Sequence, residues 1–158
     1  MLAALYDKTK EPALRERAYR SFNWATYCSD SQGVVKAGPN EFTGHWYSDG
    51  YGDYIRHFYR GLASVPAWAA PDENHVLGTT RLVKSVTYEP VRVRYVTALP
   101  GGKDVLRLTK KPVRVTSGTV VLIEGQAQDG FDAMPIRNGG FAVRLRRGSG
   151  TEVTIDLP

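Results

Sequence analysis

The side chains best suited to chemistry gather in one stretch, residues 44–60, which reads GHWYSDGYGDYIRHFYR. It contains one of the three tryptophans, four of the nine tyrosines and two of the three histidines. Aromatic rings with polar edges stack on sugar rings, and carboxylates accept hydrogen bonds from vicinal hydroxyl groups. The sequence therefore predicts a ligand surface suited to carbohydrate, made by His45, Trp46, Tyr47, Asp49, Tyr51 and Asp53.

A structural interpretation of the same residues stays open. Tyrosines at helical spacing commonly form a core, and Trp46 would then be a packing anchor. Asp49 would cap a helix, and Asp53 would favour the positive N-terminal end of that helix.

A catalytic or metal-binding interpretation depends on whether the stretch is one continuous helix. In such a helix, a spacing of four would align imidazoles and carboxylates as metal ligands or as an acid–base set. The glycines at 44, 50 and 52 argue against continuity, so only Asp53 and His57 are expected to share a face. No nucleophile accompanies them, and we predict neither a metal nor a cofactor. Weak acid–base candidates remain at Asp49, Asp53 and His57.

Two amphipathic helices are expected to position this stretch. Pro12 suits the first turn of a helix, and Leu14, Ala18 and Phe22 then follow at intervals of four up to a predicted end near Ser29. A second helix is expected to begin after residues 48–49 and to end at residues 65–66. Its apolar residues recur at i, i+3, i+4, i+7, i+8 and i+11, namely Tyr51, Tyr54, Ile55, Phe58, Tyr59 and Leu62.

Beyond Asp72 the apolar period changes from that of a helix to that of a strand. Val91, Val93 and Tyr95 alternate with arginines, and similar alternation recurs up to Leu157 between glycine-containing turns. About seven or eight short antiparallel strands are expected, which favours a β-sandwich. We therefore predict an α+β chain, with a helical hairpin at 1–65, a proline-rich linker at 66–74 and an antiparallel β-sandwich at 75–158.

The formal charge of +5 is concentrated in the β-rich part. Residues 71–158 hold 13 Lys and Arg against 9 Asp and Glu, a balance of +4. Six arginines are expected on the solvent face of the strands. A solvated, edge-protected sheet face is the favoured interpretation, and a surface that binds nucleic acid or an acidic polysaccharide is the alternative. The strand aromatics Tyr88, Tyr95 and Phe141 are expected to point inward, which makes nucleic acid the less favoured partner. The six are Arg92, Arg94, Arg107, Arg114, Arg144 and Arg146.

The sequence contains no pattern typical of a disulfide-rich protein, a signal peptide, a membrane span or a complete calcium loop. The single cysteine, Cys28, excludes an internal disulfide framework. No stretch has the pattern of a signal peptide or the length of a membrane span, although a domain of a longer exported protein would look the same. Asp129 and Asp132 resemble half of a calcium loop without its further ligands, so this segment is expected to be an ordinary loop.

The order of these segments resembles the C-terminal end of bacterial α/α-toroid proteins, such as six-hairpin glycosidases and terpenoid-cyclase-like toroids. The resemblance is carried by the sequence WYSDGYGDYIRHF of residues 46–58, the proline-rich linker and the β-rich part that follows. It implies the last hairpin of a helical ring, with an accessory β-sandwich and a carbohydrate-like or lipid-like ligand. No catalytic residue is transferred from it.

The sequence thus favours a non-catalytic binding or structural module of a larger bacterial protein, with carbohydrate as the expected partner. A portion of a polysaccharide hydrolase or lyase is the competing interpretation. A basic surface for nucleic acid or acidic polysaccharide is the second alternative. The sequence determines neither the enzymatic status of the chain nor its cellular address.

Overall fold

The computed structural model describes residues 2–26 and 57–158. The chain divides into two compact units, Met1–Val65 and Pro66–Pro158, called here the helical unit and the β unit. It is an α+β protein, as the change of apolar period predicts.

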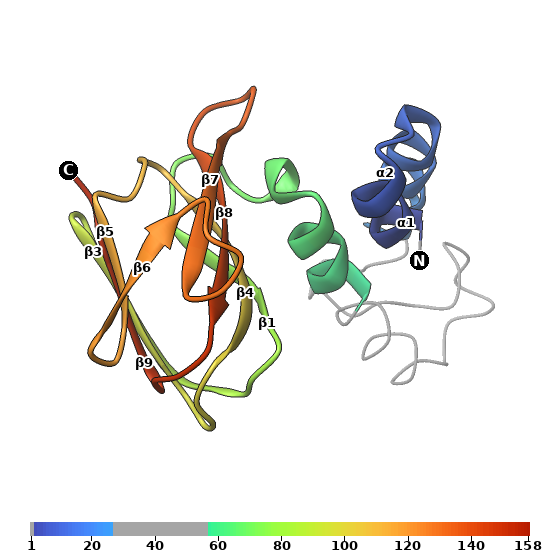
Figure 1. Ribbon diagram of the computed structural model, residues 1–158. Coiled ribbons are helices and arrows are strands. Elements are labelled where there is room, and N and C mark those ends of the chain that lie inside the picture. The colour runs from blue at the N-terminus through green and yellow to red at the C-terminus, as the bar shows by residue number, and fades with distance from the viewer. Residues whose placement is uncertain (1, 27–56) are drawn as a thin grey trace, which may run out of the picture. The chain divides into compact units, whose positions relative to one another are not determined.

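The helical unit contains α1 (Leu2–Thr9), α2 (Pro12–Thr26) and a helix at 57–64. Lys10, with a positive φ of 60°, turns the chain between α1 and α2, and Pro12 begins α2 as expected. Figure 1 shows α1 and α2 side by side. The predicted end of α2 near Ser29 and the predicted start of the second helix lie outside the described residues.

Phe22 is the point around which the described helices pack. Its ring meets the ring of Phe58 edge to face, with 6.0 Å between the ring centroids. A side-chain carbon added at Gly61 would lie 2.6 Å from the Phe22 ring, so the absence of a side chain there lets the helix at 57–64 approach α2 closely.

The β unit begins with a short 3-10 helix, η2 (Pro66–Trp68), and continues as nine strands. The strands are β1 (His75–Thr79), β2 (Val83–Glu89), β3 (Arg92–Thr97), β4 (Gly102–Leu108), β5 (Arg114–Ser117), β6 (Val120–Glu124), β7 (Gly130–Pro135), β8 (Phe141–Arg147) and β9 (Glu152–Asp156). Their order in space is β1-β4-β8-β7-β6-β5-β9-β3-β2.

This sheet curls until its two ends, β1 and β2, come near each other, so that it is almost barrel-like (Figure 1). Every neighbouring pair is antiparallel except β6 and β7, which run parallel over a short register. The prediction of an antiparallel β-rich part is therefore correct in outline. The expected two-layer sandwich of seven or eight strands differs in detail, because the structure has one curled sheet of nine strands.

The two strands that the sequence did not reveal are β1 and β7. β1 is short, and its register shifts between Val76 and Gly78. β7 begins with Gly130 and ends at Pro135, residues that are typical of turns. β1 pairs with β4, which is distant in sequence, and β7 pairs with the next strand, β8. Neither pairing is indicated by local alternation.

The core of the β unit fills the inside of the curled sheet. It is formed by residues from seven strands and one residue that follows β9, all at most 6% exposed. These are Val93, Tyr95, Leu106, Leu108, Val115, Leu122, Phe131, Val143, Leu145, Val153, Ile155 and Leu157. The interior is thus occupied by side chains, as in a small closed sheet.

Candidate functional site

The predicted carbohydrate surface lies outside the described residues. This applies to all six of its members: His45, Trp46, Tyr47, Asp49, Tyr51 and Asp53. The glycines at 44, 50 and 52 lie there too, as does Asp53 of the expected Asp53–His57 pair, so that interpretation stays a prediction.

His57 is the one predicted acid–base residue that the structure describes. Its side chain is exposed and borders a cavity of about 150 Å³. The other lining residues are apolar or small except for Arg60, and they include Ala3 and Phe22. Among the residues that line this cavity, none is a carboxylate that would orient the imidazole.

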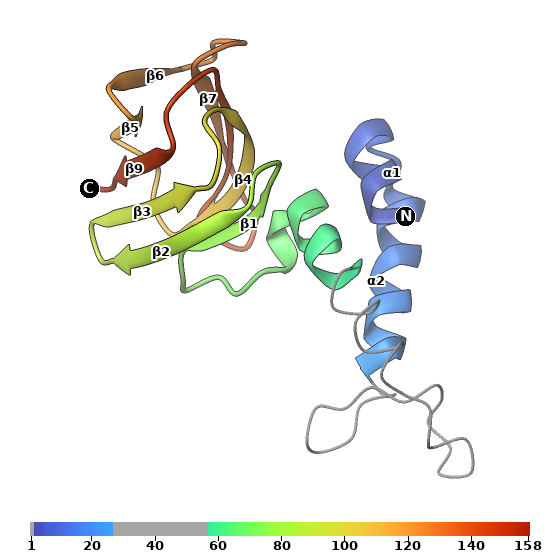
Figure 2. The ribbon, with the colours of Figure 1, turned by 90° about the horizontal axis from the view of Figure 1, so that it is seen from below.

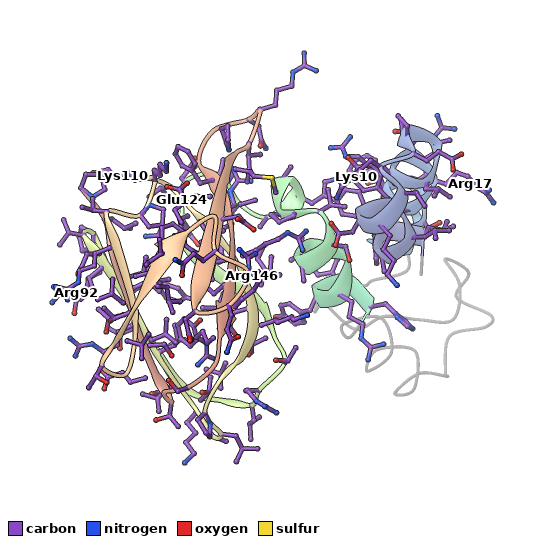
Figure 3. The ribbon with its side chains drawn as sticks, viewed as in Figure 1. Lys10, Arg17, Arg92, Lys110, Glu124 and Arg146 are labelled. Carbon is purple, nitrogen blue, oxygen red and sulfur yellow. The ribbon has the colours of Figure 1, made fainter. Side chains whose placement is uncertain are left out.

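Three of the six arginines predicted to form a basic surface on the β unit are paired with acidic neighbours. Arg92 Nε lies 2.7 Å from Asp156 Oδ1, and Figure 3 shows Arg92 at the periphery of the unit. The hydrogen bond to Asp156 and the charge of that carboxylate raise the pKa of Arg92. Three similar pairs join Arg94 to Glu152, Lys111 to Glu124 and Arg146 to Asp132.

Arg107 corrects the prediction that alternation places all six arginines in solvent. It does point to the outer face of β4, but it is 0% exposed. Its Nη1 donates to the Pro66 carbonyl at 3.1 Å and its Nη2 to the Gly139 carbonyl at 2.7 Å. Arg107 therefore holds η2 and the turn between β7 and β8 against the sheet, and we call this arrangement the Arg107 clamp.

Two opposing effects act on the guanidinium of the Arg107 clamp. Burial lowers the pKa of Arg107, and the nearby carboxylate of Asp72 opposes that shift. Asn138 adds a second attachment, since its amide donates to the Ala67 carbonyl at 3.1 Å. The Nε of Arg107 is buried and makes no hydrogen bond.

Residues 130–132 of the expected loop at 129–132 belong to a strand, which corrects the sequence interpretation, and Asp129 lies in the bend before it. Gly130–Pro135 forms β7, Phe131 enters the core, and Asp132 pairs with Arg146 on β8. Asp129 has a positive φ of 48° and accepts a hydrogen bond from the Gly148 N–H at 2.7 Å. Both carboxylates are therefore used to join β7 to β8 and the turn after it.

Inside the curled sheet lies an ion pair that sequence reasoning missed. Arg147 Nε donates to Asp104 Oδ2 at 2.6 Å, and both side chains are 0% exposed. The Tyr95 hydroxyl donates to the same carboxylate oxygen at 2.8 Å. The signal was present in the alternation, because Asp104 is in phase with Leu106 and Leu108 and must therefore point inward.

The Asp104–Arg147 pair is connected to the loops at one end of the sheet. Arg147 Nη1 donates to the Gly150 carbonyl at 3.1 Å, and the Ser117 hydroxyl donates to the Ser149 carbonyl at 2.6 Å. Gly102 lies directly opposite Arg147 in the ladder, with a positive φ of 123°. A side chain there would press on Thr80 and approach the guanidinium, so glycine leaves the space that Arg147 needs.

The pKa of Tyr95 is raised far above its usual range. Burial contributes most, and the charge of Asp104 and the hydrogen bond to it act in the same direction. Tyr95 therefore remains a neutral hydrogen-bond donor at any physiological pH. Arg147 Nη1 also donates to the Ser117 hydroxyl at 3.5 Å. We call these four residues, Tyr95, Asp104, Arg147 and Ser117, the Asp104 network.

A shallow depression of about 300 Å³ lies on the surface above this end of the sheet. Its lining includes Lys103, Gln128, Arg146 and Gly148. Lys103 is exposed and makes no ion pair in the part of the chain that the structure describes. The depression therefore combines one available ammonium group with polar backbone and amide groups, which suits an anionic ligand.

In residues 2–26 and 57–158, no three His, Cys, Asp or Glu side chains gather where they could hold a metal ion. Within the same ranges, none of the helices has the length and apolar character needed to span a bilayer.

Comparison with known proteins adds no relative: no family model, no curated protein and no solved structure matches the chain.

Proposed function

We propose that this chain is a non-catalytic structural and binding module of a larger bacterial protein. In this proposal the β unit is a rigid support, and the segment from Trp46 to His57 contributes a surface for carbohydrate. The aromatic and acidic composition of that segment is the reason for choosing carbohydrate.

The filled interior of the β unit supports its proposed role as a rigid support. The inside of the β unit is filled by apolar side chains and by an ion pair that is 0% exposed. A ligand of the β unit therefore binds to its outside, and the buried Asp104 is bound to a guanidinium and a hydroxyl rather than available to a substrate.

Exposed apolar side chains of the helical unit support its role as part of a larger assembly. Leu5 is 47% exposed and Tyr59 is 59% exposed. We propose that further helices of the same larger protein cover these residues, as the resemblance to α/α-toroid proteins implies.

Calorimetric titration of the whole chain against neutral and acidic polysaccharides tests the carbohydrate proposal. We expect saturable binding that is lost in Trp46→Ala and kept in Tyr59→Ala, the matched control at an exposed aromatic outside the predicted surface. Absence of binding to every polysaccharide, by a chain that melts cooperatively, would exclude carbohydrate as the ligand. Release of shortened chains that stops in Asp53→Asn and His57→Ala would establish the hydrolase or lyase alternative instead.

The depression at Lys103 favours a second candidate, the binding of an acidic polysaccharide on the β unit. Here we expect affinity that falls with added salt, and that falls about tenfold in Lys103→Ala. Lys84→Ala is the matched control, because Lys84 is also an exposed strand lysine but lies outside the depression. Equal loss in the two variants would indicate attraction by net charge alone.

A further inference from the structure

The most exposed strand of the β unit is β2, which forms one end of the nine-stranded sheet. Only Val83 among its seven residues is partly buried, and the other six are exposed. Figure 2 shows β2 at the border of the β unit, next to β3. A strand in this position presents unpaired backbone groups to any strand that can match them.

The backbone register identifies which residues of β2 face outward. The bonds from Thr97 N to Thr151 O and from Leu157 N to Val91 O show that odd residues of β3 face β9. Even residues of β3 therefore face β2, where their direct partners are Ser85, Thr87 and Glu89. It follows that Val86 and Tyr88 direct their N–H and C=O groups to the open edge.

The opposite end of the sheet is better protected. β1 is shorter than β2, and its central residue Leu77 is buried. The Val76 N–H donates to the Tyr88 hydroxyl at 3.1 Å, so this backbone donor of β1 is already satisfied. Pairing with another chain is therefore expected at β2 rather than at β1.

We propose that β2 pairs antiparallel with β2 of a second copy of this chain, about a two-fold axis at Thr87. A two-fold axis perpendicular to the sheet pairs residues of equal parity. In this register Val86 and Tyr88 of one copy exchange backbone hydrogen bonds with Tyr88 and Val86 of the other, about four bonds in all. The bulge between Val83 and Ser85 lies outside the paired residues.

The side chains favour a second copy over an arbitrary peptide, because β2 is complementary to itself in this register. Val86 and Tyr88, which are 40% and 45% exposed, form two aromatic–β-branched pairs on the inner face. On the outer face Thr87 meets Thr87, and Glu89 meets Ser85, with no like charges directly opposite. An arbitrary peptide would match the backbone but not these pairs.

The area covered by one pair of edge strands is small, so the dimer is expected to be reversible and to depend on concentration. Sedimentation equilibrium of the whole chain over a hundredfold range of concentration measures this. We expect the average mass to rise towards that of two chains in the wild type and to stay at that of one chain in Thr87→Lys, which puts two ammonium groups opposite each other. Thr119→Lys, the same change at an exposed turn, is expected to dimerise like the wild type.

Cross-linking tests the register itself. Cysteines at residue 87 of two copies would form a pair without backbone bonds between them, with Cα atoms about 4.5 Å apart, a separation that a disulfide can span. With Cys28 replaced by serine, Thr87→Cys is expected to give a covalent dimer under mild oxidation, and Thr119→Cys is not. A single-chain mass at every concentration, or a dimer that survives Thr87→Lys, would overturn the proposal, as would equal cross-linking at the two positions.

Discussion

Two arginines of the β unit are fully buried, and they are stabilised in different ways. Arg147 lies inside the curled sheet against a carboxylate, whereas Arg107 lies on the outside of β4 against carbonyl groups. The first arrangement neutralises the charge by direct pairing, and the second satisfies only the Nη1 and Nη2 donors of the guanidinium. The comparison shows that an outward position in a strand does not guarantee contact with water, because a covering segment can bury it.

The difference predicts unequal costs of breaking the two arrangements. The largest effect is expected for Asp104→Ala, which leaves the Arg147 guanidinium buried without its counter-charge. We expect the free energy of unfolding to fall by about 3–5 kcal/mol, measured by denaturant titration. A loss below about 1 kcal/mol would mean that water reaches Arg147 and that the pair is not a buried one.

A smaller effect is expected for Arg107→Met, because this change leaves neutral carbonyl groups unsatisfied rather than a charge. The expected loss of stability is about 2–3 kcal/mol for the two acceptors, Pro66 and Gly139. Limited proteolysis should also cut residues 66–74 faster than in the wild type. Unchanged proteolysis would show that Asn138 and apolar contacts hold η2 without the Arg107 clamp.

Tyr95→Phe measures the contribution of the Tyr95 hydroxyl to the Asp104 network apart from that of the ion pair. It removes one donor from Asp104 while Arg147 stays in place, so the expected loss is about 1–1.5 kcal/mol. The double variant Tyr95→Phe with Asp104→Ala should then lose less than the sum of the two single losses. Additive losses would indicate that the hydroxyl and the carboxylate act independently.

The smallest effect is expected at the exposed pair of Arg146 and Asp132. The hydrogen bond from Arg146 lowers the pKa of Asp132, and the side chain of Asp132 is 40% exposed. Its contribution is therefore present above the unfolded pKa of about 4 and is lost as the pH falls through the lower folded pKa. After screening by solvent, Asp132→Asn should cost a few tenths of a kcal/mol at pH 7, and this cost should shrink as the pH falls below about 4.

The sequence was sufficient where local pattern determines structure. The start of α2 at Pro12 and the alternation in β3, β8 and β9 follow from short-range preferences of single residues. The burial of Arg107 was not predictable from local pattern, because it depends on η2, which is distant in sequence. β7 was missed for a different reason, since its ladder to the neighbouring strand β8 outweighs the turn preferences of Gly130 and Pro135.

The candidate site was predicted less completely than the fold. The carbohydrate surface at 45–53 remains a prediction from composition. The inward direction of Asp104 was readable from its phase with Leu106. The pairing of Asp104 with Arg147 was not readable, because the ladder between β4 and β8 cannot be read from one strand. Tyr88 points to the inner face as expected, yet it is 45% exposed because β2 lies at the edge.

The position of β9 has a consequence for how the β unit is made in the cell. β9 is the last strand in the chain, yet it lies between β3 and β5 and pairs with both. During synthesis the β2–β3 and β5–β6 hairpins can form early, but they cannot be joined until residues 152–156 have left the ribosome. Until then β3 and β5 each keep an open edge, so the nascent β unit depends on its final strand, and the completing step is long-range and therefore slow.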